Sequence, residues 1–446
     1  MSIKVAMVSL GCPKNQVDAE QMLYTLKQDG YTLVSEEAEA EVIIINTCGF
    51  IEDAKSEAIE NIIEAARYKQ EGKLKLLVVT GCLAERYRDD ITEEIPEVDM
   101  VVGIGSNGKI GELIKSALKG DKKNSYGEKF SLDLDAKRVL GGMPYTAYIK
   151  IADGCDNCCT YCAIPQIRGR FRSRTEESIV EEAKYLAKNG VTELIVVAQD
   201  TTAYGIDIYG EYRLPSLLKK LCKVDGIHWI RTLYTYPEKI TDELLYAIRD
   251  EEKLVPYLDI PIQHCNDEIL KKMNRKGTKA DIEKTLTKIR EIVPDITLRT
   301  TFITGFPGET EAQYEELCEF IGKWKFDRLG CFAYSEEEDT LAATMKDQVP
   351  KQTRIDRAEH IMEEQLLIAR AKNEQKIDTD TEVLIEGYDN FIRCYYGRSV
   401  ADAPDVDGKI FFLVDAPQHI GEYVMVHIND CIEYDLLGEM IYESAE

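Results

Sequence analysis

The sequence of 446 residues contains no apolar run long enough to cross a bilayer, and no segment resembles the apolar core of a secretory signal. Basic residues are scarce as well, because 55 Lys and Arg face 81 Asp and Glu, which gives a formal net charge of −26. A polyanion binds nucleic acid only through a strongly basic local patch. We therefore expect a cytoplasmic protein without a membrane partner, for which basic or protein partners are favoured.

The thirteen cysteines are odd in number, which does not suit a chain whose cysteines are all paired in disulfides. On a chain without a targeting signal they favour a reducing compartment, where thiols persist as metal ligands or as buried side chains. His228, His360, His419 and His427 have no evident partners in the sequence and are expected to be structural.

The length exceeds what one hydrophobic core usually holds, so more than one domain is expected. In the first part, short β-rich runs at residues 4–10, 41–47, 75–80 and 100–102 alternate with polar segments of helical length. This alternation is typical of a small parallel α/β domain. Residues 120–142 then lose periodicity and collect Gly, Lys, Asp and Asn, which suits a linker.

The alternation resumes with strand candidates at residues 145–151, 193–199, 229–236, 257–262, 297–304 and 328–334. Six β/α units in series predict an open or partial relative of the β/α barrel, with its chemistry in the loops after the strands. A helix is predicted at residues 351–376, and the short strands that follow predict a small antiparallel β-barrel. The α/β fold is thus divided into domains at residues 1–125, 140–376 and 377–446.

The most specific pattern is a Cys-x3-Cys-x2-Cys triplet of Cys155, Cys159 and Cys162, directly after the first central strand. A loop at a strand end can turn three thiolates toward one point, and thiolates select iron–sulfur clusters or zinc. Structural zinc needs four ligands, and no second Cys pair or nearby His completes the set. Three thiolates on a four-iron cluster leave one iron open to bind S-adenosylmethionine and cleave it to a radical. Zinc or unligated core thiols are the alternatives, and Cys158 is interpreted as a bystander.

Three further cysteines, Cys12, Cys48 and Cys82, each follow a predicted strand of the first domain. The carboxyl ends of strands in an open parallel sheet border one crevice, so these thiols can converge and hold a second cluster. Each cysteine taken singly is better explained by packing between helix and sheet. Their shared position favours the ligand interpretation.

These features together resemble the radical S-adenosylmethionine methylthiotransferases over nearly the whole chain. That family has an N-terminal domain with three cluster cysteines, a central partial barrel with the Cys-x3-Cys-x2-Cys triplet, and a C-terminal TRAM barrel, in this order. The resemblance implies S-adenosylmethionine, an electron donor and two [4Fe-4S] clusters. By the same resemblance, the radical-generating cluster is held by Cys155, Cys159 and Cys162, and the auxiliary cluster by Cys12, Cys48 and Cys82.

Three segments resemble the branch of the family that acts on a small-subunit ribosomal protein: residues 9–15 (SLGCPKN), residues 258–264 (LDIPIQH), and residues 396–399 (YGRS) with 402–404 (DAP). The transfer-RNA branch usually has Gly-Cys-Gln-Met-Asn at the first segment and Gln-Ser-Gly at the second. The resemblance implies methylthiolation of the β-carbon of an aspartate on ribosomal protein twelve, either free or within the ribosome. A transfer-RNA methylthiotransferase is the nearest alternative, and a non-catalytic metal or electron-transfer protein is a more distant one.

The proposed reaction needs no general base, because an unactivated carbon–hydrogen bond has no acidic proton to remove. Four residues on or after central strands are candidates for contacts with S-adenosylmethionine or substrate: Gln199, Gln263, Arg299 and Gly305. Polar strand residues can equally satisfy hydrogen bonds within the barrel, and the Gly-Phe-Pro-Gly sequence that begins at Gly305 can equally be a plain turn. For His264, a substrate contact and a structural role are both open.

Half of the net charge lies in residues 377–446, where sixteen Asp and Glu face Arg393, Arg398 and Lys409. Barrels that bind RNA do so through basic grooves, so an acidic barrel repels RNA and attracts a basic ribosomal protein. The alternative is that the charge serves solubility alone. The distribution of charge favours a protein substrate and makes transfer RNA an unfavourable one.

Overall fold

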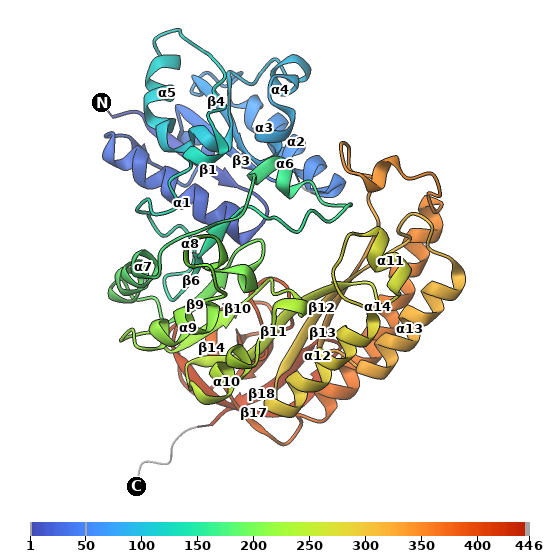
Figure 1. Ribbon diagram of the computed structural model, residues 1–446. Helices are drawn as coiled ribbons and strands as arrows, with labels where there is room; N and C mark the ends of the chain where they lie inside the picture. Colours follow the sequence, from blue (N-terminus) through green and yellow to red (C-terminus); the bar gives the residue numbers. More distant parts are fainter. Residues whose placement is uncertain (1, 50, 442–446) are drawn as a thin grey trace.

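The computed structural model describes residues 2–49 and 51–441 (Figure 1). The N-terminal part is a five-stranded parallel sheet in the order β2-β1-β3-β4-β5. All residues of β3 and β4 are buried, as expected for a parallel sheet that is covered by helices on both faces. The strands are β1 (Lys4–Ser9), β2 (Thr32–Leu33), β3 (Val42–Thr47), β4 (Leu76–Gly81) and β5 (Met100–Val102).

Helices cover both faces of this sheet. One hydrophobic cluster joins the sheet to Met22 and Ile114, and a second joins it to Ile62 and Leu83 on the other face. The helices are α1 (Pro13–Gln28), α2 (Glu52–Arg67), α3 (Cys82–Tyr87), α4 (Asp90–Glu94) and α5 (Ile110–Ala117). The predicted parallel α/β architecture is confirmed, with β2 as an additional short edge strand.

Residues 120–142, predicted as a linker, contain one short 3-10 turn at Lys129–Ser131. The Gln21 side chain donates hydrogen bonds to the carbonyls of Leu134, at 3.4 Å, and Ala136, at 3.2 Å. Arg138 forms an ion pair of 2.8 Å with Glu20. The connection is therefore fixed along α1.

The central part is a six-stranded parallel sheet in the order β13-β12-β11-β10-β9-β6. Its edge strands β6 and β13 do not pair with each other, so the sheet is an open relative of the β/α barrel, as predicted. The strands are β6 (Thr146–Lys150), β9 (Glu193–Val197), β10 (Trp229–Thr232), β11 (Leu254–Gln263), β12 (Thr297–Thr304) and β13 (Arg328–Ala333). A separate antiparallel pair, β7 (Ala152–Asp153) and β8 (Arg172–Ser173), follows β6.

Helices pack on one face of the central sheet around the largest hydrophobic cluster. Thr278 and Thr310 begin two of these helices with capping boxes, in which side chain and backbone satisfy each other's hydrogen bonds. The helices of the central part are α6 (Ile164–Arg168), α7 (Glu176–Lys188), α8 (Ile206–Tyr209), α9 (Leu214–Cys222), α10 (Asp242–Asp250), α11 (Asp267–Lys272), α12 (Lys279–Ile292), α13 (Glu311–Trp324) and α14 (Lys351–Glu374), of which α6 packs against α3 of the N-terminal part and α8 against β8.

The C-terminal part is a closed barrel of five strands in the order β14-β15-β16-β18-β17. The predicted barrel is confirmed, but β16 and β18 run parallel whereas the other pairs are antiparallel. The parallel pair arises because β17 and β18 form a hairpin that brings β18 back beside β16. The strands are β14 (Asp380–Asp389), β15 (Cys394–Arg398), β16 (Ile410–Leu413), β17 (Tyr423–Ile432) and β18 (Asp435–Met440).

This barrel packs on the face of the central sheet that the helices leave open. Trp229 and Tyr257 of the sheet share a hydrophobic cluster with Leu384 and Ala403 of the C-terminal part. In Figure 1 the strands β14, β17 and β18 lie against the central sheet, and the N-terminal sheet lies above the ends of β6 and β9. No helix within residues 2–49 and 51–441 is both long enough and apolar enough to span a membrane.

Candidate functional site

The loop that carries the cysteine triplet lies between β7 and α6. Cys155 and Cys159 are buried, Cys162 is partly buried, and Cys158 is exposed with a positive φ of 50°. The Cys155 N–H donates to the carbonyl of Gly169 at 3.2 Å, which closes the loop at its base. Three thiols are thereby held beyond the carboxyl end of β6, while the fourth cysteine points to solvent.

Polar residues from neighbouring strand ends hold this loop. The Asn157 side-chain amide lies 3.4 Å from the Cys155 sulfur and donates to Asp200 Oδ2 at 2.7 Å. Lys239 Nζ donates to Asn157 Oδ1 at 2.9 Å and also pairs with Asp200. A pocket of about 160 Å³ opens between these side chains and Phe171. The loop is fixed on one side while space remains beside it.

Burial raises the pKa of the Cys155 thiol to about 11, and it raises the pKa of Cys162 as well. Buried thiols of this kind stay protonated at neutral pH unless a metal takes the place of the proton. The Cys159 sulfur lies 3.7 Å from the Tyr236 hydroxyl. The three thiols are therefore suited to a soft metal group rather than to reaction as free nucleophiles.

The second set of cysteines lies at one edge of the N-terminal sheet. Cys12 precedes α1 at its N-cap without a side-chain capping bond, Cys48 follows β3, and Cys82 begins α3 directly after β4. Since β3 lies between β1 and β4, the three strand ends are neighbours. A Cβ added at Gly11, whose φ is 90°, would stand 2.7 Å from the Cys48 Cβ, so glycine permits this approach.

Arg168 connects the two sets of cysteines. This buried arginine at the end of α6 has its Nη2 atom 3.4 Å from the Cys82 sulfur and 3.3 Å from Asn15 Oδ1. Its Nη1 atom pairs with Asp18 of α1 and lies 3.4 Å from Asp153 of β7. A residue six positions after Cys162 thus contacts a thiol of the N-terminal set, so the segment that follows the second set packs against the first.

The environment of Cys82 is unfavourable for a free thiolate. Burial raises the pKa of the Cys82 thiol to about 12, although the charge of Arg168 opposes this shift, and the neighbouring Cys12 and Cys48 raise the pKa further. The three thiols lie at neighbouring strand ends of the sheet. A bound cation would lower the pKa of these thiols and so favour the deprotonated form.

Within residues 2–49 and 51–441, no three His, Cys, Asp or Glu side chains are grouped so that they could hold a single metal ion. Thiolates that bind separate irons of a cluster lie farther apart than the ligands of one ion. Each set offers three cysteines beside one another and leaves a fourth position free of protein ligands. The donor type and the burial fit a four-iron cluster at each set.

Gln199 and Gln263 lie at the carboxyl ends of central strands. Gln199 donates to Asp153 Oδ1 at 2.9 Å, and its buried Oε1 atom has no hydrogen-bond partner among the described residues. Gln263 ends β11 with a positive φ of 73°, which is unusual for a residue other than glycine. Both are placed where strand-end loops carry the chemistry of such sheets.

The contacts of Arg299 and Gly305 are internal to the fold. Arg299 donates to Asp259 at 3.0 Å and lies 3.6 Å from Asp407 in the C-terminal part. The N–H of Gly305 donates to the Glu309 carboxylate at 3.0 Å, and a Cβ at Gly305 would stand 2.2 Å from the Arg354 side chain. Packing against α14 therefore accounts for this glycine, and its predicted ligand contact stays a prediction.

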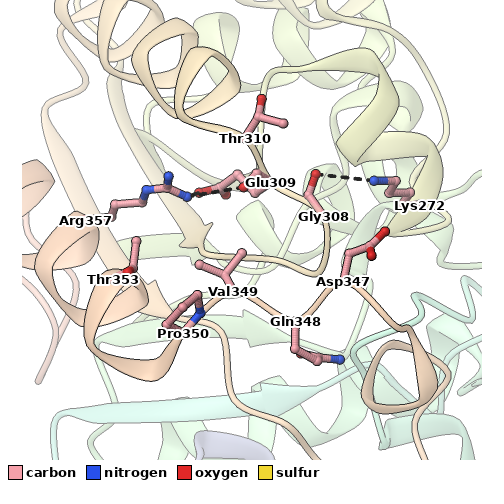
Figure 2. A pocket seen from close by; sticks show the side chains of 10 residues that line it. All are labelled: Lys272, Gly308, Glu309, Thr310, Asp347, Gln348, Val349, Pro350, Thr353 and Arg357. Carbon is pink, nitrogen blue, oxygen red and sulfur yellow. Dashed lines mark hydrogen bonds and ion pairs between the residues drawn. The ribbon is translucent and has the colours of Figure 1, made fainter.

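A larger pocket of about 470 Å³ lies away from the cysteines, next to this turn (Figure 2). Its wall contains the ion pair of 2.7 Å between Glu309 and Arg357. Lys272 reaches across to the carbonyl of Gly308 at 3.4 Å. His264 is also part of this packing, since its buried Nε2 atom lies 3.4 Å from Glu309. These contacts favour a structural role for His264.

Comparison with known proteins agrees with this arrangement. Residues 4–103 match the uncharacterized protein family UPF0004, residues 149–321 the radical SAM superfamily, and residues 378–441 the TRAM domain. The chain is 48% identical over 436 residues to the ribosomal protein uS12 methylthiotransferase RimO of Thermoanaerobacter sp. (strain X514). The alignment covers 98% of this chain and 99% of that relative. The chain belongs to the RimO family. A RimO protein of Clostridioides difficile (strain 630) is likewise 48% identical over 446 residues, with 99% and 100% of the two chains covered.

Solved structures support the fold of this RimO-family chain. The radical S-adenosylmethionine methyltransferase TsrM of Kitasatospora setae matches 74% of this chain and 73% of its own, with a TM-score of 0.57 and 14% identity. The match to the cobalamin-dependent S-adenosylmethionine radical enzyme OxsB covers 81% of this chain and 56% of the OxsB chain, with a TM-score of 0.53 and 14% identity. At these identities the likeness concerns the fold alone.

Sequence reasoning found the six cysteines but missed the charged residues between them. Arg168 and its partner Cys82 are 86 positions apart, and Lys150 pairs with Asp18 across 132 positions. No local spacing indicates such partners. Lys14 lies in the segment at residues 9–15, which indicated only the family resemblance. A lysine two residues after a candidate metal ligand is a sequence signal that could have marked it as a site residue.

Proposed function

We propose that this RimO-family chain transfers a methylthio group to the β-carbon of an aspartate on the ribosomal protein uS12. The observation that carries the proposal is the contact of Arg168 with Cys82, because it links two sets of buried or partly buried thiols at one interface. A reaction that needs two iron–sulfur centres requires such an arrangement. The names of the relatives supply the substrate.

We assign the radical-generating cluster to Cys155, Cys159 and Cys162 of the domain at residues 140–376. The auxiliary cluster is assigned to Cys12, Cys48 and Cys82 of the domain at residues 1–125. When bound, the clusters and S-adenosylmethionine supply a radical that removes a hydrogen atom from an unactivated carbon and a methylated sulfur that takes its place.

The chain's own residues then bind, orient and shield the reactants. Asn157, Asp200 and Lys239 fix the loop of Cys155, while the buried ion pairs of Arg168 hold the two domains together. The unpaired Oε1 of Gln199 and the strand-end position of Gln263 make these residues the favoured contacts for S-adenosylmethionine. An interface closed in this way keeps water from the reacting carbon.

The domain at residues 377–446 is assigned to recognition of the substrate protein. Its sixteen acidic residues against three basic ones favour a partner rich in Lys and Arg over transfer RNA. An external electron donor is required because reductive cleavage of S-adenosylmethionine consumes an electron. The substrate is met either free or within the ribosome.

The proposal is tested by mass spectrometry of uS12 after anaerobic incubation with reconstituted enzyme, reductant, sulfide and S-adenosylmethionine, with transfer RNA assayed in parallel. We expect a methylthio mass increase on a peptide of uS12 that contains an aspartate. Modification of transfer RNA alone would contradict the substrate assignment. Absence of 5′-deoxyadenosine in the reaction would contradict the radical chemistry itself.

A further inference from the structure

Lys14 is a buried lysine for which the described residues offer no paired carboxylate. Only 7% of Lys14 is exposed, and its Nζ atom lies 3.2 Å from the centroid of the Tyr234 ring. Lys150 and Arg168 at the same interface pair with Asp18, whereas Lys14 takes part in none of the ion pairs within residues 2–49 and 51–441. A buried ammonium is costly to leave unpaired, and an aromatic ring compensates only part of that cost. Its charge is therefore available to an anion.

Tyr234 and Cys12 contribute most to the electrostatic surroundings of Lys14, and the carboxylate that contributes after them is already occupied. Asp259 contributes to the electrostatic surroundings of Lys14. However, Asp259 Oδ1 accepts a hydrogen bond from Arg299 at 3.0 Å, and Oδ2 accepts one from the Tyr234 N–H at 3.0 Å. Both oxygens of Asp259 thus accept hydrogen bonds from other groups, so no carboxylate among the described residues is left to pair with Lys14.

Lys14 lies between the two sets of cysteines. It stands two residues after Cys12, in the first turn of α1. The ring beneath it, that of Tyr234, is two residues before Tyr236, whose hydroxyl lies 3.7 Å from the Cys159 sulfur. A substrate side chain that is to meet both metal centres must enter where this ammonium is placed.

We propose that Lys14 binds the carboxylate of the substrate aspartate and so selects aspartate over asparagine. The inference rests on the proposed function. The β-carbon of aspartate is bonded directly to the carboxylate carbon, so an ion pair with Lys14 fixes the reacting carbon between the two thiol sets. Removing one partner of a buried charge pair weakens binding by about thirtyfold or more.

The test measures binding of uS12 to the reconstituted enzyme under anaerobic conditions, using uS12 with its target aspartate and the same protein with asparagine there. Wild type is compared with Lys14→Met, which keeps the length of the side chain, and with Lys14→Arg, which keeps the charge. Lys4→Met is the matched control, because Lys4 is half exposed and pairs with Glu39 away from the interface. Iron content and the electron paramagnetic resonance spectrum are recorded for each protein.

We expect wild type, Lys4→Met and Lys14→Arg to bind the aspartate form more tightly than the asparagine form. Lys14→Met is expected to bind the two forms with equal affinity. That affinity should be about thirtyfold or more weaker than the affinity of wild type for the aspartate form. If Lys14 serves only to balance the charge of nearby thiolates, the iron-containing fraction of Lys14→Met will keep the preference, which would overturn the inference. If wild type modifies the aspartate form and Lys14→Met prefers that form as strongly as wild type does, the inference is refuted while the proposed function stands. A wild type that does not modify uS12 refutes the proposed function and the inference with it.

Discussion

At the scale of single residues, the loop at Cys155 allows one cysteine to be compared with three others in the same segment. Cys158 lies between Cys155 and Cys159 in the sequence, yet its side chain is exposed whereas theirs are buried. Its positive φ turns it away from the position that the other three share. Local spacing was sufficient to predict this candidate set, because its three cysteines lie within eight residues of one another.

We expect Cys155→Ser and Cys82→Ser each to remove about half of the iron from the reconstituted protein, since each disrupts one of two separate sites. Cys158→Ser is expected to keep all of it. Iron and sulfide analysis of the three variants checks this. Full loss of iron in either single variant would show that the two sites are filled only together.

Arg168 is the residue that local spacing did not reveal. Replacing it by Met leaves Asp18 with Lys150 as its remaining partner and leaves Asp153 buried near the same lysine. Because breaking a buried pair leaves an uncompensated charge, we expect a loss of about 3 kcal/mol in the free energy of unfolding. Urea unfolding measures it.

The matched control for this arginine is Arg249→Met, since Arg249 pairs with Asp250 at the surface. There we expect a change within about 0.5 kcal/mol. An Arg168→Met protein as stable as this control would mean that the interface does not depend on the buried network.

At the scale of elements, the turn from β4 into α3 decides the position of Cys82. Gly81 there has a φ of 94°, and an added Cβ would stand 2.4 Å from the Thr47 carbonyl oxygen. The turn and β3 therefore approach as closely as they do only because residue 81 has no side chain. The close approach brings the end of β4 beside Cys48.

We expect Gly81→Ala to destabilise the protein by about 3 kcal/mol and to lower the iron of the N-terminal set. Gly72→Ala is the control, because Gly72 has a similar φ of 84° but open space around its Cβ position, so backbone strain alone is expected to cost about 1 kcal/mol. Thermal unfolding and iron analysis compare the two. Equal effects would show that strain rather than the contact with β3 limits the turn.

The sequence was a good guide to elements with a strong periodic pattern. The six strands of the central sheet and the long helix α14 lie where alternating and helical patterns place them. The two-residue strand β2 is too short to leave a pattern. The strand β18 carries charged ends, and its parallel pairing with β16 depends on partners distant in the sequence. Non-local pairing, which periodicity does not encode, accounts for what was missed.

At the scale of the whole molecule, buried ion pairs join the C-terminal barrel to the central sheet. Arg398 of β15 pairs with Glu193 of β9 at 2.6 Å, and Arg328 of β13 pairs with Asp402. Burial alone would raise the pKa of Asp402, but the charge of Arg328 and bonds from Ser399 lower it to about 2. The attachment of the barrel therefore depends on an ionised Asp402.

The pKa of Asp402 gives this attachment a pH dependence. Because its folded-state pKa lies below the unfolded value near 4, the stabilisation is complete above about pH 4 and is lost as the pH falls toward 2. Between pH 5 and pH 3 we expect the stability difference between wild type and Asp402→Asn to shrink by about 1 kcal/mol. Urea unfolding across this range tests it, with the exposed Asp405→Asn as control. A constant difference would contradict the low pKa.

Charge on the barrel surface acts over a longer range. Asp430, Glu433 and Glu439 are exposed on or beside β17 and β18. If such residues attract uS12, raising the salt concentration from about 50 to 500 mM should weaken binding about tenfold or more. Replacing the three by Lys should reduce both affinity and salt dependence. Binding of uS12 that is insensitive to salt would remove the support that charge gives to a protein substrate.

The contact of Arg168 with Cys82 also has a consequence for synthesis of the chain on the ribosome. A nascent chain that has emerged only as far as residue 125 presents Cys12, Cys48 and Cys82 without the guanidinium that contacts Cys82. The surroundings of the first set are completed some forty residues later in synthesis, by the short helix α6 that follows the loop of the second set. The surroundings of Cys82 are thus complete only after residue 168 has been synthesised, and a chain that stalls before this point leaves the thiol without the contacts that bury it.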